Sequence, residues 1–264
     1  MLSVLIPSYN ISVVNLVNQI YTQLTAISIS FEIICLDDAS ESVYNLENQK
    51  INKLNNCSFT VLKKNIGRSS IRNLLALQAN YNWLLFLDAD VLAVSDNFIK
   101  NYIDVIKNTN DTVFLGGIKY RDIDGNHLLR WKFGKRNEEV PVLKREKHAY
   151  HYFFTANLLI NKSIFNSIKF NEKLVNYGYE DLLFAKQLYR KKINVKHLKN
   201  EVFHLGIDKD LEFINKTKKG IQNLNYLLKE KLIDKEDTKL SKPFIGLMET
   251  DRHKFHISFL THRI

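Results

Sequence analysis

The sequence predicts an α/β fold in which a mostly parallel central sheet has helices on both faces. The first observation is that short apolar runs alternate with segments of helical periodicity through the first half of the chain. The second is that these runs are almost continuously apolar, as expected for strands covered on both faces. The third is size, because 264 residues can bury a full hydrophobic core within one large domain.

Strands and helices alternate in the first half of the predicted fold. The expected strands are the apolar runs Ser3–Pro7, Glu32–Asp37, Phe59–Lys63, Trp83–Asp88 and Thr112–Ile118. Three helices are expected from residues that recur at helical spacing on one face: Val13, Leu16, Val17, Ile20 and Leu24; Ile71, Leu74, Leu75 and Gln78; and Phe98, Ile99, Tyr102, Ile103 and Ile106. Ser95 is the expected N-cap of the third helix. In open sheets of this kind, ligands bind at the carboxyl ends of the strands.

The second half begins with a basic segment, Asp122–His148, that has few apolar residues and is expected to be an irregular surface loop. The elements expected after it are a strand at His151–Ile160, a helix from about Tyr179 to Lys191, strands at Asn194–Leu198 and Glu201–Leu205, and a helical segment from Asp208. A tail with His253, His256 and His262 ends the chain. We therefore expect one domain over residues 1–206 and a helical C-terminal extension over residues 207–264.

Composition places the chain among ordinary globular proteins, with 45% hydrophobic and 25% charged residues. Cys35 and Cys57 lie in apolar stretches without ligand or disulfide spacing, which indicates buried reduced thiols of a cytosolic protein. No signal peptide or membrane-spanning stretch is visible, so any membrane contact should be peripheral. The net charge of +10 favours polyanionic partners, although an ordinary solvated surface explains it equally well.

The clearest chemical pattern is the segment Trp83–Asp90, an apolar strand that ends in two carboxylates separated by one residue. Asp88 and Asp90 should flank the strand end and present hard oxygen ligands there. Mg²⁺ and Mn²⁺ suit such ligands, and a protein typically supplies one or two carboxylates beside substrate phosphates. A polar turn after the strand is the alternative, because two aspartates at this spacing are common.

Polar residues also follow the first two strands. Asp37 and Asp38 end the second strand, where a carboxylate can accept hydrogen bonds from a nucleobase or a ribose, although the pair can also be only a turn. The first strand ends in Pro7–Asn10, which adds an aromatic ring and hydroxyl groups at the same edge. Polar groups at three neighbouring strand ends therefore indicate a ligand site there.

These segments together resemble the family-2 glycosyltransferases. The matching runs, in the family's order and spacing, are Ser3–Asn10, Leu36–Ser40, Asn65–Asn73 and Leu87–Asp90, and Gly178–Phe184 resembles the Gly-x-Glu-Asp element of galactosyltransferase-like enzymes. The resemblance covers roughly residues 1–206 and implies a GT-A, Rossmann-like fold in an inverting enzyme of bacterial type. It places the nucleotide-sugar site in residues 1–118, and the acceptor site and catalytic base in residues 119–206.

The resemblance also implies roles for the strand-end residues. On the donor side, Asp38 contacts the base, Pro7 and Tyr9 line its pocket, Asp88 contacts the ribose or a metal-bound water, Ala89 lies beside the donor, and Arg72 helps to hold the carboxylates. Asp90 ligates Mn²⁺ or Mg²⁺, and His204 is either a further ligand or a structural histidine. The alternative for Arg72 is an ordinary helix-surface arginine. No role is expected for His127, His148, His151 or His197.

Asp181 matches the family's catalytic base, and Glu180 precedes it. A transfer with inversion needs only one base, which removes the proton of the acceptor hydroxyl as this group attacks the anomeric carbon. The two carboxylates can also simply cap the helix that begins there. The residues expected on the acceptor side are Asn157, Gly178 and Tyr179. Ala39 departs from the family's pattern, in which glycine usually follows the acidic pair.

The function predicted by the resemblance is metal-dependent transfer of a sugar from a nucleotide diphosphate, usually UDP in this family, to a hydroxyl of a glycan or lipid-linked acceptor. A sugar nucleotidyltransferase is the alternative, but Pro7–Ile11 lacks the glycine-rich basic loop that holds a triphosphate. A nucleic-acid-binding module is a third hypothesis, and because the sequence has no signature of one, no nucleic-acid partner is expected.

The extension after residue 206 mixes lysines with apolar residues. We expect it either to pack its apolar side on the domain or to rest on the membrane as a basic amphipathic surface near a lipid-diphosphate acceptor. The second arrangement requires the anionic lipids of the inner leaflet. The expected location is therefore the cytoplasm, with the protein either free there or peripheral on the inner face of the membrane.

Overall fold

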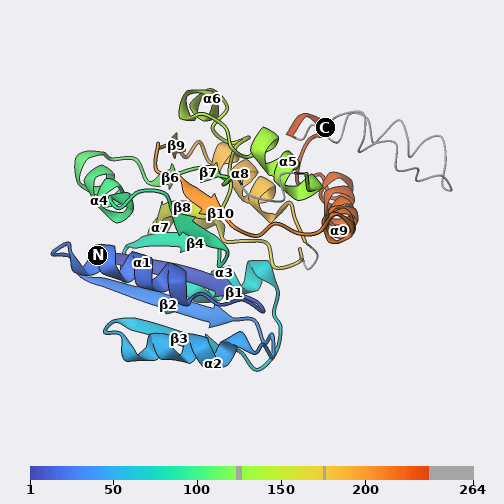
Figure 1. Ribbon diagram of the computed structural model, residues 1–264. Coiled ribbons are helices and arrows are strands. Elements are labelled where there is room, and N and C mark those ends of the chain that lie inside the picture. Colours follow the sequence, from blue (N-terminus) through green and yellow to red (C-terminus); the bar gives the residue numbers. More distant parts are fainter. Residues whose placement is uncertain (123–126, 175–176, 238–264) are drawn as a thin grey trace.

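A seven-stranded sheet forms the centre of the computed structural model, which describes residues 1–122, 127–174 and 177–237 (Figure 1). Its strands, in spatial order, are β3 (Cys57–Val61), β2 (Phe31–Asp37), β1 (Leu2–Ser8), β4 (Trp83–Leu87), β8 (Asn157–Asn161), β6 (Val113–Leu115) and β9 (Lys196–His197). Both pairings of β8 are antiparallel and the other four are parallel. The mostly parallel sheet that the sequence predicts is thus confirmed.

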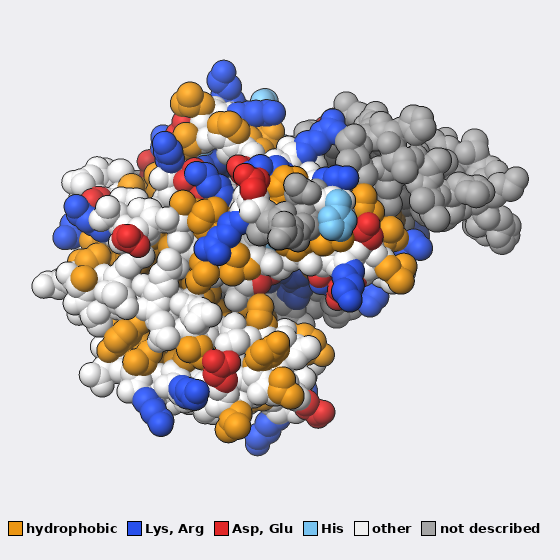
Figure 2. Space-filling model, in the orientation of Figure 1, with side chains coloured by type: hydrophobic (Ala, Val, Ile, Leu, Met, Phe, Trp, Pro, Cys, Tyr) orange, Lys and Arg blue, Asp and Glu red, His pale blue; other side chains and the backbone are white. Residues whose placement is uncertain are grey.

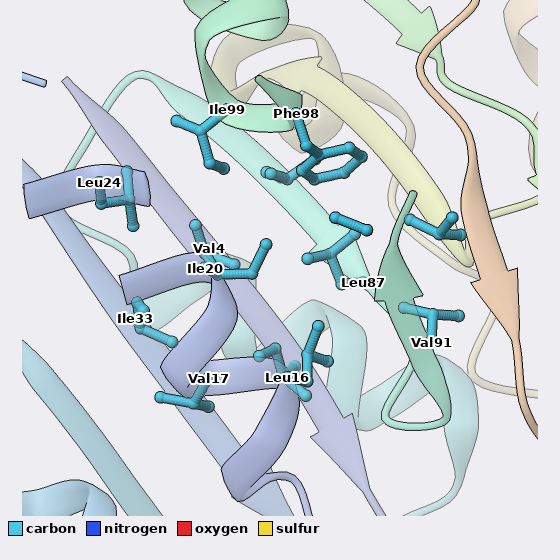
Figure 3. Packing of buried hydrophobic residues seen from close by; sticks show 14 of the residues in the cluster. Val4, Leu16, Val17, Ile20, Leu24, Ile33, Leu87, Val91, Phe98 and Ile99 are labelled. Carbon is cyan, nitrogen blue, oxygen red and sulfur yellow. The ribbon is translucent and has the colours of Figure 1, made fainter. Parts of the chain in front are cut away.

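Helices cover both faces of this sheet. The helices on one face are α1 (Val14–Thr25) and α4 (Phe98–Asn108), and those on the other are α3 (Arg68–Gln78), α7 (Lys162–Ile168) and α8 (Glu180–Arg190). Successive strand residues point to opposite faces, so Val4 packs with Leu16 and Ile20 of α1 (Figure 3). Leu5, the next residue, packs on the other face with residues of α3. Burying each such side chain contributes about 1.5–3 kcal/mol.

A second, three-stranded sheet consists of β5 (Val91–Ala93), β10 (Val202–His204) and β7 (Ile118–Lys119). The single strand expected over Thr112–Ile118 is wrong, because Gly116 and Gly117 divide it into β6 and β7, which belong to different sheets. Gly117 has a left-handed backbone (φ 92°), and Gly116 has no space for a Cβ. The small sheet pairs His204 with Val91 and so brings two distant segments together.

The expected irregular loop over Asp122–His148 is also wrong, because it contains α5 (Leu129–Asn137) and α6 (Val142–Lys147), while residues 123–126 lie outside the described part. Arg145, a basic residue of α6, is buried rather than solvated. The Arg145 guanidinium donates to the carbonyl oxygens of Val140, Leu115, Gly116 and Leu198 and contacts Nδ1 of His197 at 3.0 Å.

Three smaller expectations also differ from the structure. The strand expected over His151–Ile160 is limited to Asn157–Asn161. Ser95 is not the N-cap of α4, because Asn97 occupies that position. The Ser95 hydroxyl accepts a hydrogen bond from the backbone N–H of Asn97. The helices α2 (Tyr44–Asn48) and η1 (Gln49–Lys53) and the strand β5 were not expected.

The described part of the extension contains α9 (Asp210–Lys229) and η2 (Lys235–Asp237), and α9 lies beside α5 (Figure 1). Leu224 and Leu227 of α9 form an apolar cluster with Leu174 and with Leu183 of α8, which confirms that the helix packs on the domain. The tail with His253, His256 and His262 lies outside the described residues. Within the described ranges, no helix is both long and apolar enough to cross a membrane.

Candidate active site

The carboxyl ends of β1, β2 and β4 meet at one edge of the large sheet. Ser8 is in register with Asp37, and the N–H of Asp38 donates to the carbonyl of Ser8, so the first two strand ends are joined directly. Pro7 is half-buried in β1, whereas Tyr9, just beyond it, is 60% exposed. The Tyr9 ring is therefore available to a ligand at this edge, such as a planar base.

Asp38 is buried and stabilises the loop before α3. Its Oδ1 accepts a hydrogen bond from the N–H of Ile66 at 2.7 Å, and its Oδ2 accepts one from the N–H of Gly67 at 2.9 Å. A carboxylate has about four lone-pair sites, so these bonds leave it acceptor capacity. Contact between Asp38 and a nucleobase stays a prediction.

Asp88 is paired with Arg72 of α3, at 2.6 Å between Oδ1 and Nη2. Arg72 is only 2% exposed and lies 5.7 Å from the centre of the Phe170 ring, so it is not a surface arginine. Burial alone would raise the pKa of Asp88, but the charges of Arg72 and Arg68 outweigh burial and hold that pKa below its ordinary value. Ala89, the next residue, is half-buried against the core.

Asp90 and His204 face each other, with 3.7 Å between Oδ2 of the carboxylate and Nε2 of the imidazole. The pairing of β5 with β10 produces this contact, and Tyr120 stacks on the imidazole with 5.6 Å between ring centres. Gly206 lies directly against this carboxylate, because a Cβ at this position would overlap Oδ2 of Asp90 and displace it. Sequence reasoning did not identify Gly206, since nothing in the sequence predicts its contact with a residue so far away in the chain.

The donor atoms at this point fit a divalent cation. A guanidinium can only donate, so in the contact of 3.4 Å from Arg130 Nη2 the Nε2 atom of His204 carries its lone pair and is the acceptor. Binding of a cation through Nε2 would replace this contact. Two atoms 3.7 Å apart can both reach one Mg²⁺ at about 2.1 Å. Among the described residues, no group of three His, Cys, Asp or Glu side chains could hold a metal. The set of two protein ligands suits a cation that also binds phosphate oxygens.

Arg130 of α5 was not among the predicted site residues. It is 6% exposed, pairs with Glu138 at 3.1 Å, and lies over the rings of Tyr120 and Phe213. Its Nη1 is buried without a hydrogen-bond partner. The sequence placed Arg130 in a solvated basic loop, and only the apolar neighbours Leu128, Leu129 and Trp131 indicated a helix with a buried side.

The second group of carboxylates opens α8. Asp181 accepts hydrogen bonds from the N–H and the hydroxyl of Thr155, at 3.1 and 2.7 Å. Burial first, and then the charge of Glu180, raises the pKa of Asp181 to about 6. Glu180 is itself buried and pairs with Arg68 at 3.0 Å and with Arg72 at 3.9 Å.

Arg72 therefore lies between the two groups of carboxylates. It contacts Asp88 through Nη2 and Glu180 through Nη1, so the end of β4 and the start of α8 adjoin one guanidinium. The charge of Arg72 lowers the pKa of Asp181 and the charge of Asp88 raises it. His204 in turn lowers the pKa of Asp88. Carboxylates that are far apart in the sequence thus share one neighbourhood.

The residues expected on the acceptor side differ in their surroundings. Gly178 and Tyr179 form a left-handed turn (φ 91° and 70°) directly before Glu180. Asn157 has no exposed surface: its amide nitrogen donates to Gly117 and Asn200, and its oxygen accepts from Tyr102. This geometry favours a structural role for Asn157 over contact with an acceptor.

A cavity of about 740 Å³ lies elsewhere, on the outer side of α8. Its lining includes Leu182, Ala185 and Tyr189, and none of the predicted site residues contributes to it. The strand-edge site has the charged groups and the backbone turns, so its chemistry rather than the volume of a cavity identifies it as the candidate active site.

Comparison with known proteins agrees with this fold. The family model described as glycosyl transferase family 2 matches residues 3–169. S. aureus TarS 1–349 in complex with UDP matches with a TM-score of 0.54 and 23% identity, over 76% of this chain and 60% of that one. TarS 1–349 in complex with UDP-GlcNAc has a TM-score of 0.54 at 22% identity, over 79% of this chain and 60% of that one.

A third solved structure is the mannosyltransferase PcManGT from Pyrobaculum calidifontis in complex with GDP-Man and Mn²⁺. It matches with a TM-score of 0.55 and 13% identity, over 77% of this chain and 56% of that one. At these identities the likeness shows a common GT-A fold, and this chain spans less than two thirds of the length of the structures that it matches. No curated protein matches the chain.

Proposed function

Because the chain belongs to glycosyl transferase family 2, we propose that it moves a sugar from a nucleotide-diphosphate donor to a hydroxyl group of a glycan or lipid-linked acceptor, with inversion at the anomeric carbon. The chain is a glycosyltransferase with a GT-A fold. The donor, the mechanism and the acceptor are the proposal. The observation that supports it best is the position of Arg72 between Asp88 and Glu180.

In the proposed reaction Asp181 is the base. As the acceptor oxygen attacks the anomeric carbon, its proton passes to Asp181, and the bond from that carbon to the diphosphate oxygen breaks with its electron pair on the diphosphate. A single displacement of this kind inverts the anomeric centre. The raised pKa of Asp181 matches this task, because a carboxylate with a pKa of about 6 is ionised at neutral pH and holds a proton better than an ordinary aspartate.

Asp90 and His204 are the residues that would hold Mn²⁺ or Mg²⁺, and the bound ion would neutralise charge on the leaving diphosphate. Arg68, which pairs with Glu180, and Arg130, which contacts His204, add fixed positive charge to the site. The proposed donor is a uridine nucleotide, with Tyr9, Pro7 and Asp38 around its uracil base. The complexes of TarS with UDP and UDP-GlcNAc support the class of donor, and that of PcManGT with Mn²⁺ supports the class of metal.

The deciding experiment is Mn²⁺-dependent hydrolysis or transfer of a panel of UDP- and GDP-sugars. Asp90→Ala and Asp181→Asn should each lower kcat by ~10²–10⁴-fold, as expected when a metal ligand or a general base is lost. The exposed Asp96→Ala and Asp104→Asn are matched controls and should keep wild-type activity. Full activity in both Asp90→Ala and Asp181→Asn would reject the proposal.

A lipid-linked acceptor would bring the protein to a membrane surface. The net charge of +10 favours contact with anionic lipid, although on the face shown in Figure 2 the Lys and Arg side chains are scattered among apolar and acidic ones. We therefore propose peripheral binding to the inner, anionic leaflet. It should appear as sedimentation with vesicles that contain phosphatidylserine, reversed by salt, and equal sedimentation without anionic lipid would contradict it.

A further inference from the structure

The middle of α9 touches the loop that leads into α8. A Cβ added to Gly220 would lie 3.2 Å from the carbonyl oxygen of Tyr177 and 3.4 Å from Cε2 of Tyr179. A Cβ on Gly178 would lie 3.7 Å from the Cα of Gly220, so the two glycines face each other. Glycine inside a helix costs about 1 kcal/mol relative to alanine. The helix thus has its weakest residue at the point of closest approach to this loop.

Other residues on the same side of α9 contact the same loop. The buried amide of Asn223, three residues after Gly220, donates to the carbonyl oxygen of Gly178 at 2.8 Å. The Tyr179 ring packs into the apolar cluster that contains Leu224 and Leu227. Residues three and four apart lie on one side of a helix, so these contacts come from a single face of α9.

The loop is strained enough to need such support. Gly178 and Tyr179 both have left-handed backbones, which costs about 1–2 kcal/mol for a residue other than glycine. Tyr179 is the N-cap of α8, and the next two residues are Glu180 and Asp181. A shift of the loop therefore becomes a shift of the first turn of α8.

We propose that α9 is a positioning element for catalysis, in which Gly220 and Asn223 hold the loop 177–179 so that Asp181 meets the acceptor hydroxyl. This inference rests on the proposed role of Asp181 as the base. It gives the C-terminal extension a part in the reaction, although α8 and α9 both follow residue 169, where the match to the family model ends.

Gly220→Ala separates positioning from simple packing. The added methyl group forces the loop to move by a few tenths of an ångström, while alanine strengthens α9 by up to about 1 kcal/mol. Positioning predicts roughly tenfold lower kcat for hydrolysis of whichever UDP- or GDP-sugar the wild type turns over, because small misplacements of catalytic groups have large effects. The KM for the donor, the Kd for UDP with Mn²⁺ and the free energy of unfolding should stay close to wild type.

Asn223→Ala should act in the same direction, since it removes the hydrogen bond to Gly178. Lys219→Ala and Asn215→Ala lie on the exposed side of α9 and are the matched controls, expected to leave kcat unchanged. Hydrogen exchange gives a readout without turnover: amides of residues 179–184 should exchange faster in Gly220→Ala and Asn223→Ala, while those of β1 and β2 stay protected.

Two outcomes would overturn the inference. One is that Gly220→Ala and Asn223→Ala both have wild-type kcat and wild-type hydrogen exchange at residues 179–184. The other is a parallel loss of stability, UDP affinity and kcat, which is the result for a helix that only packs. Full activity of Asp181→Asn would instead contradict the proposed function, and exchange at residues 179–184 would still report whether α9 holds the loop.

Discussion

Asp181 is half-buried beside the buried carboxylate of Glu180, yet two groups favour its ionised form. Burial and the charge of Glu180 raise its pKa, and the charge of Arg72 and the hydroxyl of Thr155 lower it. The two raising effects are larger, so the pKa is about 6. The proposed base acts only when it has lost its proton, so protonation of Asp181 should lower activity. The protonated fraction of Asp181 grows as pH falls through about 6, whereas an ordinary aspartate would stay ionised down to about 4.

We therefore predict an acidic limb near pH 6 in the profile of kcat/KM, with about a tenfold fall per pH unit below it. Glu180→Gln removes the neighbouring negative charge and should move the limb to lower pH. Thr155→Val removes the hydroxyl that bonds the ionised carboxylate and should move it to higher pH. Opposite shifts would identify Asp181 as the titrating group, and a limb that stays in place in both variants would exclude it.

The positions of single site residues were predictable where charged residues adjoin an apolar strand or helix. Asp88 and Asp90 follow an obvious strand, and Glu180 and Asp181 open a helix with a clear apolar face. Gly206, Arg130 and Thr155 were not predictable in this way, because their places depend on contacts with residues far away in the chain. Contacts between two sheets depend on the tertiary structure, and the local sequence pattern does not predict them.

At the level of elements, periodicity predicted α1, α3, α4 and α8, whose apolar stripes face a sheet. It failed for α5 and α6, because their sequences are mostly basic and Arg145 provides the buried contact of α6. His197 belongs to the same interior. Burial lowers its pKa to about 4, so the imidazole is neutral, accepts from Arg145 at Nδ1 and donates from Nε2 to Ala149.

Arg145→Met should lower the free energy of unfolding by about 3–5 kcal/mol, because several buried carbonyl groups and the imidazole lose their donor together. Arg145→Lys should lower it nearly as much, since one ammonium cannot reproduce the planar set of donors. The exposed Lys144→Met on the same helix is the control and should change stability by less than about 0.5 kcal/mol. Urea denaturation measures all three, and near-wild-type stability of Arg145→Met would show that α6 is held in another way.

At the scale of the whole molecule, the candidate site exists only because two sheets and α8 converge. The large sheet contributes Asp88, the small sheet places His204 beside Asp90, and α8 presents Asp181. The mostly parallel sheet was predictable from the sequence, and so was the edge at which its polar strand ends meet. The small sheet was not, since β5 and β7 are too short for a periodic pattern.

This convergence predicts that nucleotide and metal stabilise the fold together. UDP at a hundred times its Kd should add about 2.7 kcal/mol in the presence of Mn²⁺, which raises Tm by roughly 5–10 °C for a chain of this size. UDP or Mn²⁺ alone should have much smaller effects, because the proposed cation site has two protein ligands and needs the diphosphate to complete it.

Asp90→Ala should abolish the part of the shift that depends on Mn²⁺ and keep the small shift from UDP alone, while Asp96→Ala should behave as wild type. A thermal scan across UDP, GDP, ADP and CDP, each with and without Mn²⁺, also identifies the base. If UDP raised Tm equally with and without Mn²⁺, the Asp90–His204 pair would not be a metal site, and the charge of the diphosphate would then have to be met by Arg68, Arg72 and Arg130 alone.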